Sequence, residues 1–318
     1  MKKVLLLTLL CIGTIFLLLF ATDFPSFAQS EKPEKVWIGW KFDKGTVREY
    51  EGTYSSESVT DIEIEKTKLE KEPTPMKLKT KSLITWKCLN VDEKGDIVSL
   101  AVDTQLTQAD IKTPEGKQYN LKEKQLKNQS SLPEEVFMYI YPRIRYQWEI
   151  STEKKKLLNW AFINDDDSVG EREHGDPLGI TDSYKQFPSA EVDLGGNWKH
   201  TTNESAEGYN QLVETTYTFK SVATKQERKC AVVEIKAEVY AVTVDNDGKE
   251  VKIKIGKGSG TIYHDIEKGC LVECNESFDI DGKIPLTGKL KAMTTIIKNK
   301  YNSLMVLKKE YKEEEKKK

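Results

Sequence analysis

Cysteine and histidine are the residues of this sequence best suited to covalent or metal chemistry. Beyond the N-terminal segment the cysteines are Cys88, Cys230, Cys270 and Cys274. In an exported chain, four cysteines suggest two disulfides with three possible pairings. Cys270 and Cys274 lie four residues apart on one expected strand, roughly 13 Å, whereas a disulfide needs Cα atoms within about 7 Å. This pairing is therefore excluded.

The register of the expected hairpins restricts the other pairings. A turn at 246–248 places Cys230 opposite His264, and the next turn places Cys270 on the other side of the same strand. Cys230 and Cys270 are then about 9.5 Å apart, too far for a disulfide. The same register brings Cys230, His264 and one of Cys270 or Cys274 near each other, which loosely resembles a three-ligand zinc shell, but a register error of one residue would send the ligands to opposite faces. We predict buried, unpaired thiols and no metal, and a disulfide of Cys88 stays open.

A dense acidic cluster is the second candidate for metal chemistry. It comprises Asp165, Asp166, Asp167, Glu171, Glu173, His174 and Asp176. Hard cations such as Ca²⁺ bind several oxygens at once, which such a cluster could supply. The spacing does not match an EF-hand loop, because Val169 stands at the fifth position and no terminal Glu is correctly placed. A solvated acidic loop is the preferred interpretation, and calcium binding at 165–167 stays open.

Motifs of the common catalytic sites are absent from the sequence. It contains no HExxH, no GxSxG, no P-loop and no CxxCH for haem attachment. The segment 256–260, Gly-Lys-Gly-Ser-Gly, is rich in glycine but lies within an expected strand, where glycines mark a bend or bulge. We predict no catalytic residue and no cofactor. A glycan hydrolase is the least favoured alternative, since the chain has enough acids for the required carboxylate pair.

The elements that must position these residues are mainly strands. From Val232 to Val244 apolar and charged residues alternate strictly, as do Val251 to Ile255, and the segments between them are rich in Asn, Asp and Gly. The expected meander has strands at 230–244, 251–263, 270–279 and 286–298, with turns at 245–248, 267–269 and 281–283.

Strand length indicates how the sheet is shaped. Fifteen residues from Cys230 to Val244 would span roughly 50 Å, against about 17 to 20 Å for a usual strand. Because strands that long must twist and coil, we predict a mainly β fold of long, strongly curved antiparallel sheets resembling a half-barrel. The segment Ile84-Thr85-Trp86-Lys87 is echoed by Tyr217-Thr218-Phe219-Lys220, which suggests two similar halves.

The expected organisation is a signal peptide at 1–28, an N-terminal β-rich half at 29–186, a C-terminal β-meander half at 187–307 and a charged tail at 308–318. One or two short helices are expected in the middle: one at 135–141 after a capping box at 131–134, and one at 151–162, with strand as the alternative for both. The charged segment 63–81, which contains two prolines, is expected to be a loop or linker.

The N-terminus has the organisation of an export signal. Lys2 and Lys3 precede an apolar run at 4–21, and Ser26-Phe27-Ala28 provides small residues around a cleavage site. Cleavage after Ala28 would start the mature protein at Gln29. The run is longer than the ~7 to 15 residues of a usual signal core, so an uncleaved anchor is the alternative. We predict a periplasmic or extracellular protein without a transmembrane segment after cleavage.

Composition excludes one class of partner. The 318 residues carry a net charge of −2, with 31% charged residues, whereas nucleic-acid-binding proteins show a strong basic excess. Most of the six tryptophans are expected in the core.

Together these features resemble a family. The meander, the repeated aromatic-Thr-Lys strand, the Gly-rich bend at 256–261 and the turn from Tyr263-His264-Asp265 to Gly269 are similar to exported, β-rich bacterial envelope proteins of unknown function, which share features with LolA-like lipoprotein-carrier half-barrels. The resemblance covers roughly residues 36 to 305. It implies a concave sheet that holds apolar matter under a lid, and it assigns no functional residue.

The expected function follows from this shape. The leading hypothesis is a non-enzymatic binding or carrier protein of the bacterial cell envelope that holds a lipid, another apolar ligand or a partner segment in the concave face. The alternative is a structural or assembly protein of the envelope that acts through protein–protein contacts at exposed strand edges.

Overall fold

The structure is a computed structural model of the whole chain. It describes residues 35–64, 74–93, 97–151, 156–164, 166–172, 187–206, 209–244, 248–285 and 293–313. The chain divides into two compact units, Met1–Glu34 and Lys35–Lys318. The first unit, with the predicted signal peptide and its cleavage site, lies outside the described residues, and everything below concerns the second.

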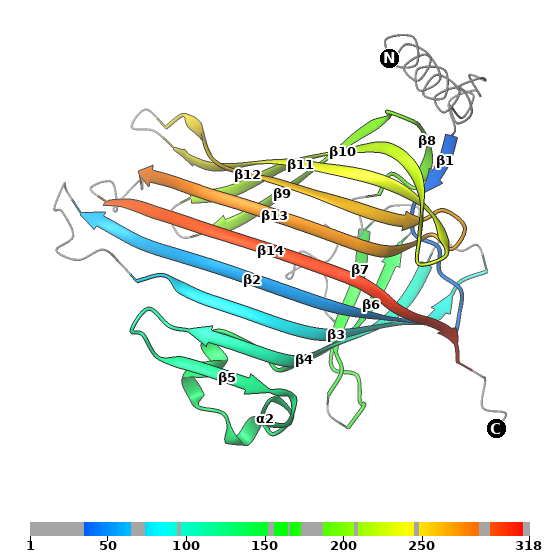
Figure 1. Ribbon diagram of the computed structural model, residues 1–318, viewed down its shortest axis with the longest axis horizontal. Coiled ribbons are helices and arrows are strands. Elements are labelled where there is room, and N and C mark those ends of the chain that lie inside the picture. Colours follow the sequence, from blue (N-terminus) through cyan, green and yellow to red (C-terminus); the bar gives the residue numbers. More distant parts are fainter. Residues whose placement is uncertain are drawn as a thin grey trace, which may run out of the picture. The chain divides into compact units, whose positions relative to one another are not determined.

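Two antiparallel sheets make up the second unit (Figure 1). The small sheet pairs β1 (Lys35–Ile38) with β8 (Ala190–Asp193). The large sheet has twelve strands in the order β7-β6-β4-β3-β2-β14-β13-β12-β11-β10-β9, with β5 also paired to β4. Its strands are β2 (Thr46–Ile64), β3 (Met76–Val91), β4 (Ile97–Lys112), β5 (Gln118–Lys122), β6 (Arg143–Ser151), β7 (Lys156–Phe162), β9 (Asn197–Ala206), β10 (Tyr209–Lys225), β11 (Arg228–Val244), β12 (Glu250–Asp265), β13 (Cys270–Pro285) and β14 (Met293–Lys312).

The predicted fold class is confirmed. The sheet is antiparallel, long-stranded and open, since β7 and β9 stand at its two ends in the described part of the chain. Strands β11 and β12 agree with the predicted meander to within a few residues, because strict alternation of apolar and polar residues specifies a half-buried strand. The turn before β13 is also confirmed, with Gly269 at φ +55°.

The last predicted hairpin is wrong. The sequence Asp281-Gly282-Lys283 was expected to turn, but β13 continues to Pro285 and β14 begins only at Met293. Gly282 serves close packing instead: a Cβ atom there would lie 2.6 Å from Cγ2 of Ile255. The glycine is therefore needed by a neighbouring side chain and not by a turn.

One bulge explains an error in register. Near the turn the predicted pairing holds, with Val244 opposite Glu250 and Tyr240 opposite Lys254. The register then shifts between Val239 and Tyr240, beside Gly256, so that His264 lies opposite Ala231 and not opposite Cys230. The glycine-rich segment thus contains the irregularity that glycines in strands indicate, and that irregularity defeats a register counted from the turn.

The middle segment differs from its prediction in one helix. Residues 134–138 form the 3-10 turn η2 (Glu134–Met138), close to the predicted helix, after η1 (Gln129–Ser131) and a five-residue helix α2 (Glu123–Lys127) that was not predicted. Residues 151–162 are not helical in the described residues, because β6 ends at Ser151 and β7 occupies 156–162. The strand alternative is correct there.

Two further boundaries are corrected. The predicted linker 63–81 is strand at both ends, since β2 reaches Ile64 and β3 begins at Met76, and its centre lies outside the described residues. The predicted tail at 308–318 is wrong for 308–312, which continue β14 beside β2. That same pairing joins the two predicted halves in one sheet, and their division near residue 187 stays a prediction.

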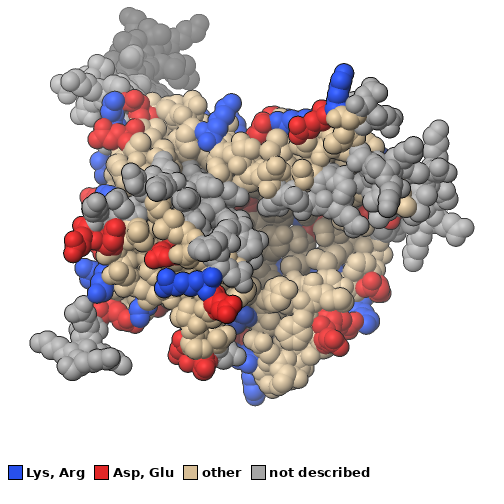
Figure 2. All heavy atoms as spheres, turned by 180° about the vertical axis from the view of Figure 1, so that it is seen from behind, with Lys and Arg blue, Asp and Glu red and all other residues tan. Residues whose placement is uncertain are grey.

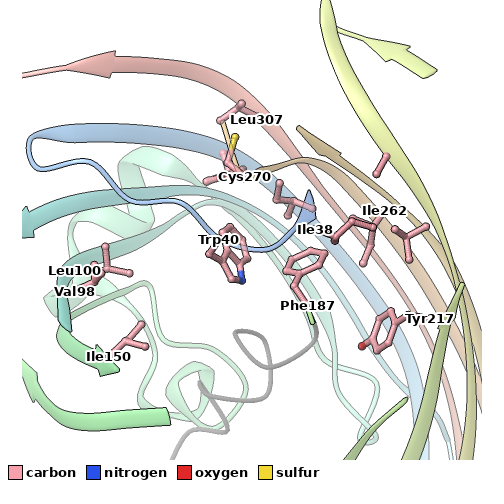
Figure 3. Close-up of a cluster of buried hydrophobic side chains, with 14 of the residues drawn as sticks. Ile38, Trp40, Val98, Leu100, Ile150, Phe187, Tyr217, Ile262, Cys270 and Leu307 are labelled. Carbon is pink, nitrogen blue, oxygen red and sulfur yellow. The ribbon is translucent and has the colours of Figure 1, made fainter. Parts of the chain in front are cut away.

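Three apolar clusters lie on one face of the large sheet, called here the inner face, and the opposite face is called the outer face. The largest cluster gathers under β1, the segment 39–43 and Phe187 at one end of the long strands (Figure 3). A second packs α2 and η2 against β4 and β5. The third belongs to strands β10 to β14. Most tryptophans contribute to the first cluster, as predicted.

Candidate functional site

Three aromatic rings form a continuous row on the inner face, across β13, β14 and β2. Phe278 lies opposite Tyr301 in the register, and Tyr301 lies opposite Ser56 beside Tyr54. The Phe278 and Tyr301 rings stack with centroids 4.7 Å apart and an interplanar angle of 14°, and Tyr301 and Tyr54 are 6.1 Å apart. All three are half-buried. We call these three residues the aromatic floor.

Gly258 of β12 leaves room for the Phe278 ring of the floor. Gly258 lies opposite Phe278, and a Cβ atom on it would be 2.5 Å from the Phe278 ring. The ring therefore lies directly over the backbone of the neighbouring strand. Any side chain at 258 would push the ring away from β12 and disturb its stacking on Tyr301.

The third apolar cluster continues the floor along the strands. Its buried members are Val239, Ala241, Ile255, Ile280 and Ile284, and Phe278 and Tyr301 pack against them. Within the described residues, all members of the cluster belong to β10–β14 of the large sheet. In the other two clusters, the described residues include a second layer of strand, loop or helix that covers the sheet.

A few polar groups lie within this apolar surface. Glu276 is opposite Ser303, one row along from the floor. Burial raises the pKa of the Glu276 carboxyl, and hydrogen bonds with Ser303 and Cys274 offset this only in part. The side-chain oxygen of Asn299 is buried without a hydrogen-bond partner in the described structure. An apolar surface with a few polar groups is the usual lining of a small-molecule site, in which the polar groups orient the ligand.

The surface seen from behind is hollowed. In the view from behind, on the side of β6, β7 and β9, a recess opens near the middle of the surface, and its visible walls are largely uncharged residues (Figure 2).

The end of the inner face that the first cluster fills, called here the closed end, contains the buried His264. His264 is fully buried, and its Nε2 lies 2.9 Å from the carbonyl oxygen of Gly39. Rings of Phe187 and Trp40 lie at 4.5 and 6.1 Å. Because the carbonyl can only accept, Nε2 donates, and Nδ1 is left as an acceptor with no partner in the described structure. Burial lowers the pKa of His264 to about 4, so the ring is neutral at neutral pH.

No disulfide joins the cysteines of the described residues, and the thiols of Cys88 and Cys230 donate to nearby backbone carbonyls. Cys88, Cys230, Cys270 and Cys274 are all free, and the open question of a Cys88 disulfide is answered against one. Cys230 and Cys270 lie on opposite sides of Asp265, one residue from the predicted position. Burial raises the pKa of Cys270 to about 12 and of Cys230 to about 11, so both stay protonated.

The zinc shell does not form. The one-residue register shift puts His264 opposite Ala231, the neighbour of Cys230. Because side chains alternate along a strand, His264 and Cys230 point to opposite faces of the sheet. Among the described residues no three His, Cys, Asp or Glu side chains gather as a metal site.

The predicted acidic loop lies partly outside the described residues, which omit Asp165 and 173–186. Asp166 and Asp167 are exposed. Asp167 forms an ion pair with Arg145, and Asp166 accepts hydrogen bonds from the backbone and hydroxyl of Ser168. These carboxylates are used locally and do not converge on a common point.

Sequence reasoning missed the floor residues. Phe278, Tyr301 and Tyr54 come from three strands, and nothing in their local sequence distinguishes them from other strand aromatics. The signal that could have located the floor is the row Gly256, Gly258 and Gly260, since glycine in a central strand indicates close approach of a neighbouring group.

Comparisons with known proteins give only weak likenesses. No protein-family model and no curated protein matches the chain. Among solved structures, lipovitellin, studied for its lipid–protein interactions, is 10% identical over 87% of this chain with a TM-score of 0.31, and the chain spans only 26% of it. An exported Bacteroides fragilis protein with a YmcC-like fold is 9% identical over 88% of this chain and 100% of its own, with a TM-score of 0.24. Likeness at this level assigns neither ligand nor function.

Membrane insertion by a helix finds no support in the described chain: none of its helices has the length and apolar character needed to span a bilayer.

Proposed function

We propose that this protein is exported and binds an apolar ligand, such as a lipid acyl chain, on the aromatic floor. The observation that carries the proposal is that the three rings of the floor lie side by side on the inner face and are only half-buried, while the apolar cluster beside them is fully buried.

Burial energetics favour such a ligand. Half-exposed Phe278, Tyr301 and Tyr54 leave apolar area in contact with solvent, and covering apolar area contributes about 25 cal/mol per Å². A ligand that covers ~200 Å² of this surface would gain roughly 5 kcal/mol before its own ordering costs. Glu276 and Asn299 offer a donor or acceptor at the edge of the surface for a polar head group.

Catalysis is not part of the proposal. The buried cysteines and His264 are neutral, and His264 faces rings and a backbone carbonyl instead of a nucleophile. A carrier of the LolA-like kind, which holds lipid in a curved sheet, is the functional model that we propose.

The test compares two neighbouring serines. Ser56 lies between Tyr301 and Leu78 on the inner face, whereas Ser55 points to the outer face because side chains alternate along a strand. We expect Ser56→Trp to fill the space above the floor and weaken binding of a fluorescent fatty acid, 11-(dansylamino)undecanoic acid, by about 10-fold or more. Ser55→Trp, the matched control, should leave this binding unchanged.

Mass spectrometry of lipid extracted from the purified protein provides the second readout. Wild type and Ser55→Trp should carry the same bound lipid, and Ser56→Trp should carry less. Equal probe binding by all three proteins, with circular dichroism showing that each is folded, would exclude the floor as the site.

The open edges of the sheet favour a second candidate, an envelope assembly protein. Strands β7 and β9 each pair on one side only in the described residues, and an unpaired edge can accept a strand from another chain. In-cell crosslinking from β9, without any lipid bound to the purified protein, would favour assembly over binding.

A further inference from the structure

A cavity of about 570 Å³ lies on the outer face, over the five neighbouring strands β14, β2, β3, β4 and β5. Four strand spacings make it roughly 19 Å long. It is separate from the aromatic floor, because the two lie on opposite faces of the sheet. Its ligand is therefore independent of the function proposed above.

The side chains that reach this cavity are polar. Ten of its thirteen lining residues occupy two adjacent cross-strand rows, without a bulge between them: Asn302, Ser55, Lys79, Asp110 and Asn120 in one row, and Lys300, Glu57, Lys77, Lys112 and Gln118 in the other. The other three lining residues, Ser56, Leu78 and Ile111, share one row with Tyr301, so their side chains point to the inner face and they contribute backbone here.

Charge alternates along the second row until it reaches the cavity. From β12 the row continues Lys257, Asp279, Lys300, Glu57 and Lys77, each opposite a charge of the other sign. Ion pairs join Lys300 to Asp279 at 3.6 Å and Lys77 to Glu57 at 3.1 Å. Opposite charges across strands stabilise a sheet, so this part of the row needs no ligand.

The alternation ends at β4, where Lys77 lies directly opposite Lys112. Like charges in this position destabilise a sheet. Lys112 is half-buried, and Lys79, in the next row, is exposed. Neither lysine makes an ion pair with any described residue. Asp110, opposite Lys79, accepts a hydrogen bond from Gln108 at 2.8 Å. Two ammonium groups in one cavity are thus left for a ligand.

We propose that this cavity binds an acidic oligosaccharide, with Lys79 and Lys112 holding its carboxylates and the amides of Gln118, Asn120 and Asn302 holding its hydroxyls. Lysine is a point charge suited to an anion, and an amide both donates and accepts, as sugar hydroxyls do. An elongated cavity without apolar side chains does not suit a lipid tail or the aromatic anchors of a protein interface.

Calorimetric titration with tetragalacturonate, at roughly 50 mM salt so that screening is weak, tests the proposal. Binding should be lost with neutral maltotetraose. The double variant Lys79→Gln/Lys112→Gln should bind about 10-fold more weakly, since exposed ion pairs each contribute a few-fold. The matched control, Lys236→Gln/Lys257→Gln, removes the same charge from the outer face away from the cavity and should bind like wild type.

A stability readout distinguishes this role from a structural one. Lys112→Gln removes a like-charge pair, so it should raise the midpoint of thermal unfolding while it weakens tetragalacturonate binding. A lower midpoint would contradict the repulsion on which the site is argued.

Three results would overturn the proposal: no tetragalacturonate binding at millimolar concentration, equal binding by the cavity variant and the control, or equally tight binding of tetraglutamate, which would assign the cavity to acidic peptides. Ser55→Trp should abolish tetragalacturonate binding and spare the fatty-acid probe, and Ser56→Trp should do the reverse. The failure of one site is therefore distinguishable from the failure of the other.

Discussion

Acid should destabilise this protein through one buried imidazole. His264 has no exposed surface, and its neighbours are the rings of Phe187 and Trp40 and the carbonyl of Gly39. Its pKa is lowered from 6.5 to about 4: burial is the largest cause, Arg48 and Lys41 also lower it, and the Gly39 bond and Asp265 act in the opposite direction. A proton on Nδ1 would find no acceptor in the described structure.

The sign and size follow from linkage. Below pH 6.5 the unfolded chain takes up a proton at this residue, but the folded protein does not until about pH 4, so folding loses stability as the pH falls between these values. The difference between the two pKa values, at about 1.4 kcal/mol per pH unit, amounts to about 3 kcal/mol. The contribution is complete above pH 6.5 and mostly lost at pH 4.5.

Urea unfolding at pH 7, 6, 5 and 4.5 measures this loss. Carboxylates titrate in part of the same range, so wild type must be compared with His264→Gln, whose amide can still donate to Gly39 but does not titrate. We expect the variant to be less stable than wild type at pH 7 and the gap to shrink by about 2 to 3 kcal/mol at pH 4.5. Parallel pH profiles for the two proteins would refute the reasoning, because His264 would then have the same pKa folded and unfolded.

Three further predictions concern the strand ends, the floor and export. Burial raises the pKa of Glu310, but hydrogen bonds and charge from Arg48 and Arg228 outweigh it and hold the pKa below its ordinary value. Glu310→Gln should therefore cost about 3 kcal/mol in urea unfolding at pH 7, and the loss should shrink as the pH falls below 4.5, where the unfolded wild-type chain takes up a proton before the folded protein does. A loss that does not change with pH would contradict this. Gly258→Val should displace the Phe278 ring and weaken fatty-acid binding, whereas Gly248→Val, at a turn with open space, should affect only stability. N-terminal sequencing of the exported protein should begin at Gln29, and a start at Met1 would favour the anchor.

Local pattern predicted the strands well and their ends poorly. The alternation of β11 and β12 is unambiguous, and both strands form. Asp281-Gly282-Lys283 has the composition of a turn, yet it lies within β13, because Gly282 makes room for Ile255 of the next strand. Local sequence cannot distinguish a glycine that turns the chain from one that yields space to a neighbour.

The candidate site depended on long-range register, which the sequence encodes weakly. Counting from the β11–β12 turn gave the correct pairs up to Tyr240, and the bulge beside Gly256 then shifted His264 by one residue. That shift separated the predicted zinc ligands. The aromatic floor was out of reach for the same reason, since Phe278, Tyr301 and Tyr54 meet only when three strand registers are known.

A single alternation along β2 gives the sheet two surfaces of different chemistry. From Tyr50 to Ser58, β2 pairs with β14 and β3 without a bulge, and the register shifts of these pairs lie outside that stretch, between Leu307 and Lys309 on β14. An uninterrupted register is required here, because one extra residue would bring Glu57 onto the floor and Ser56 into the cavity. Register shifts occur elsewhere in the sheet, between Leu307 and Lys309 beside the first cluster and between Val239 and Tyr240 in the third. The position of the bulges is thus itself an argument that both faces of this part of the sheet are used.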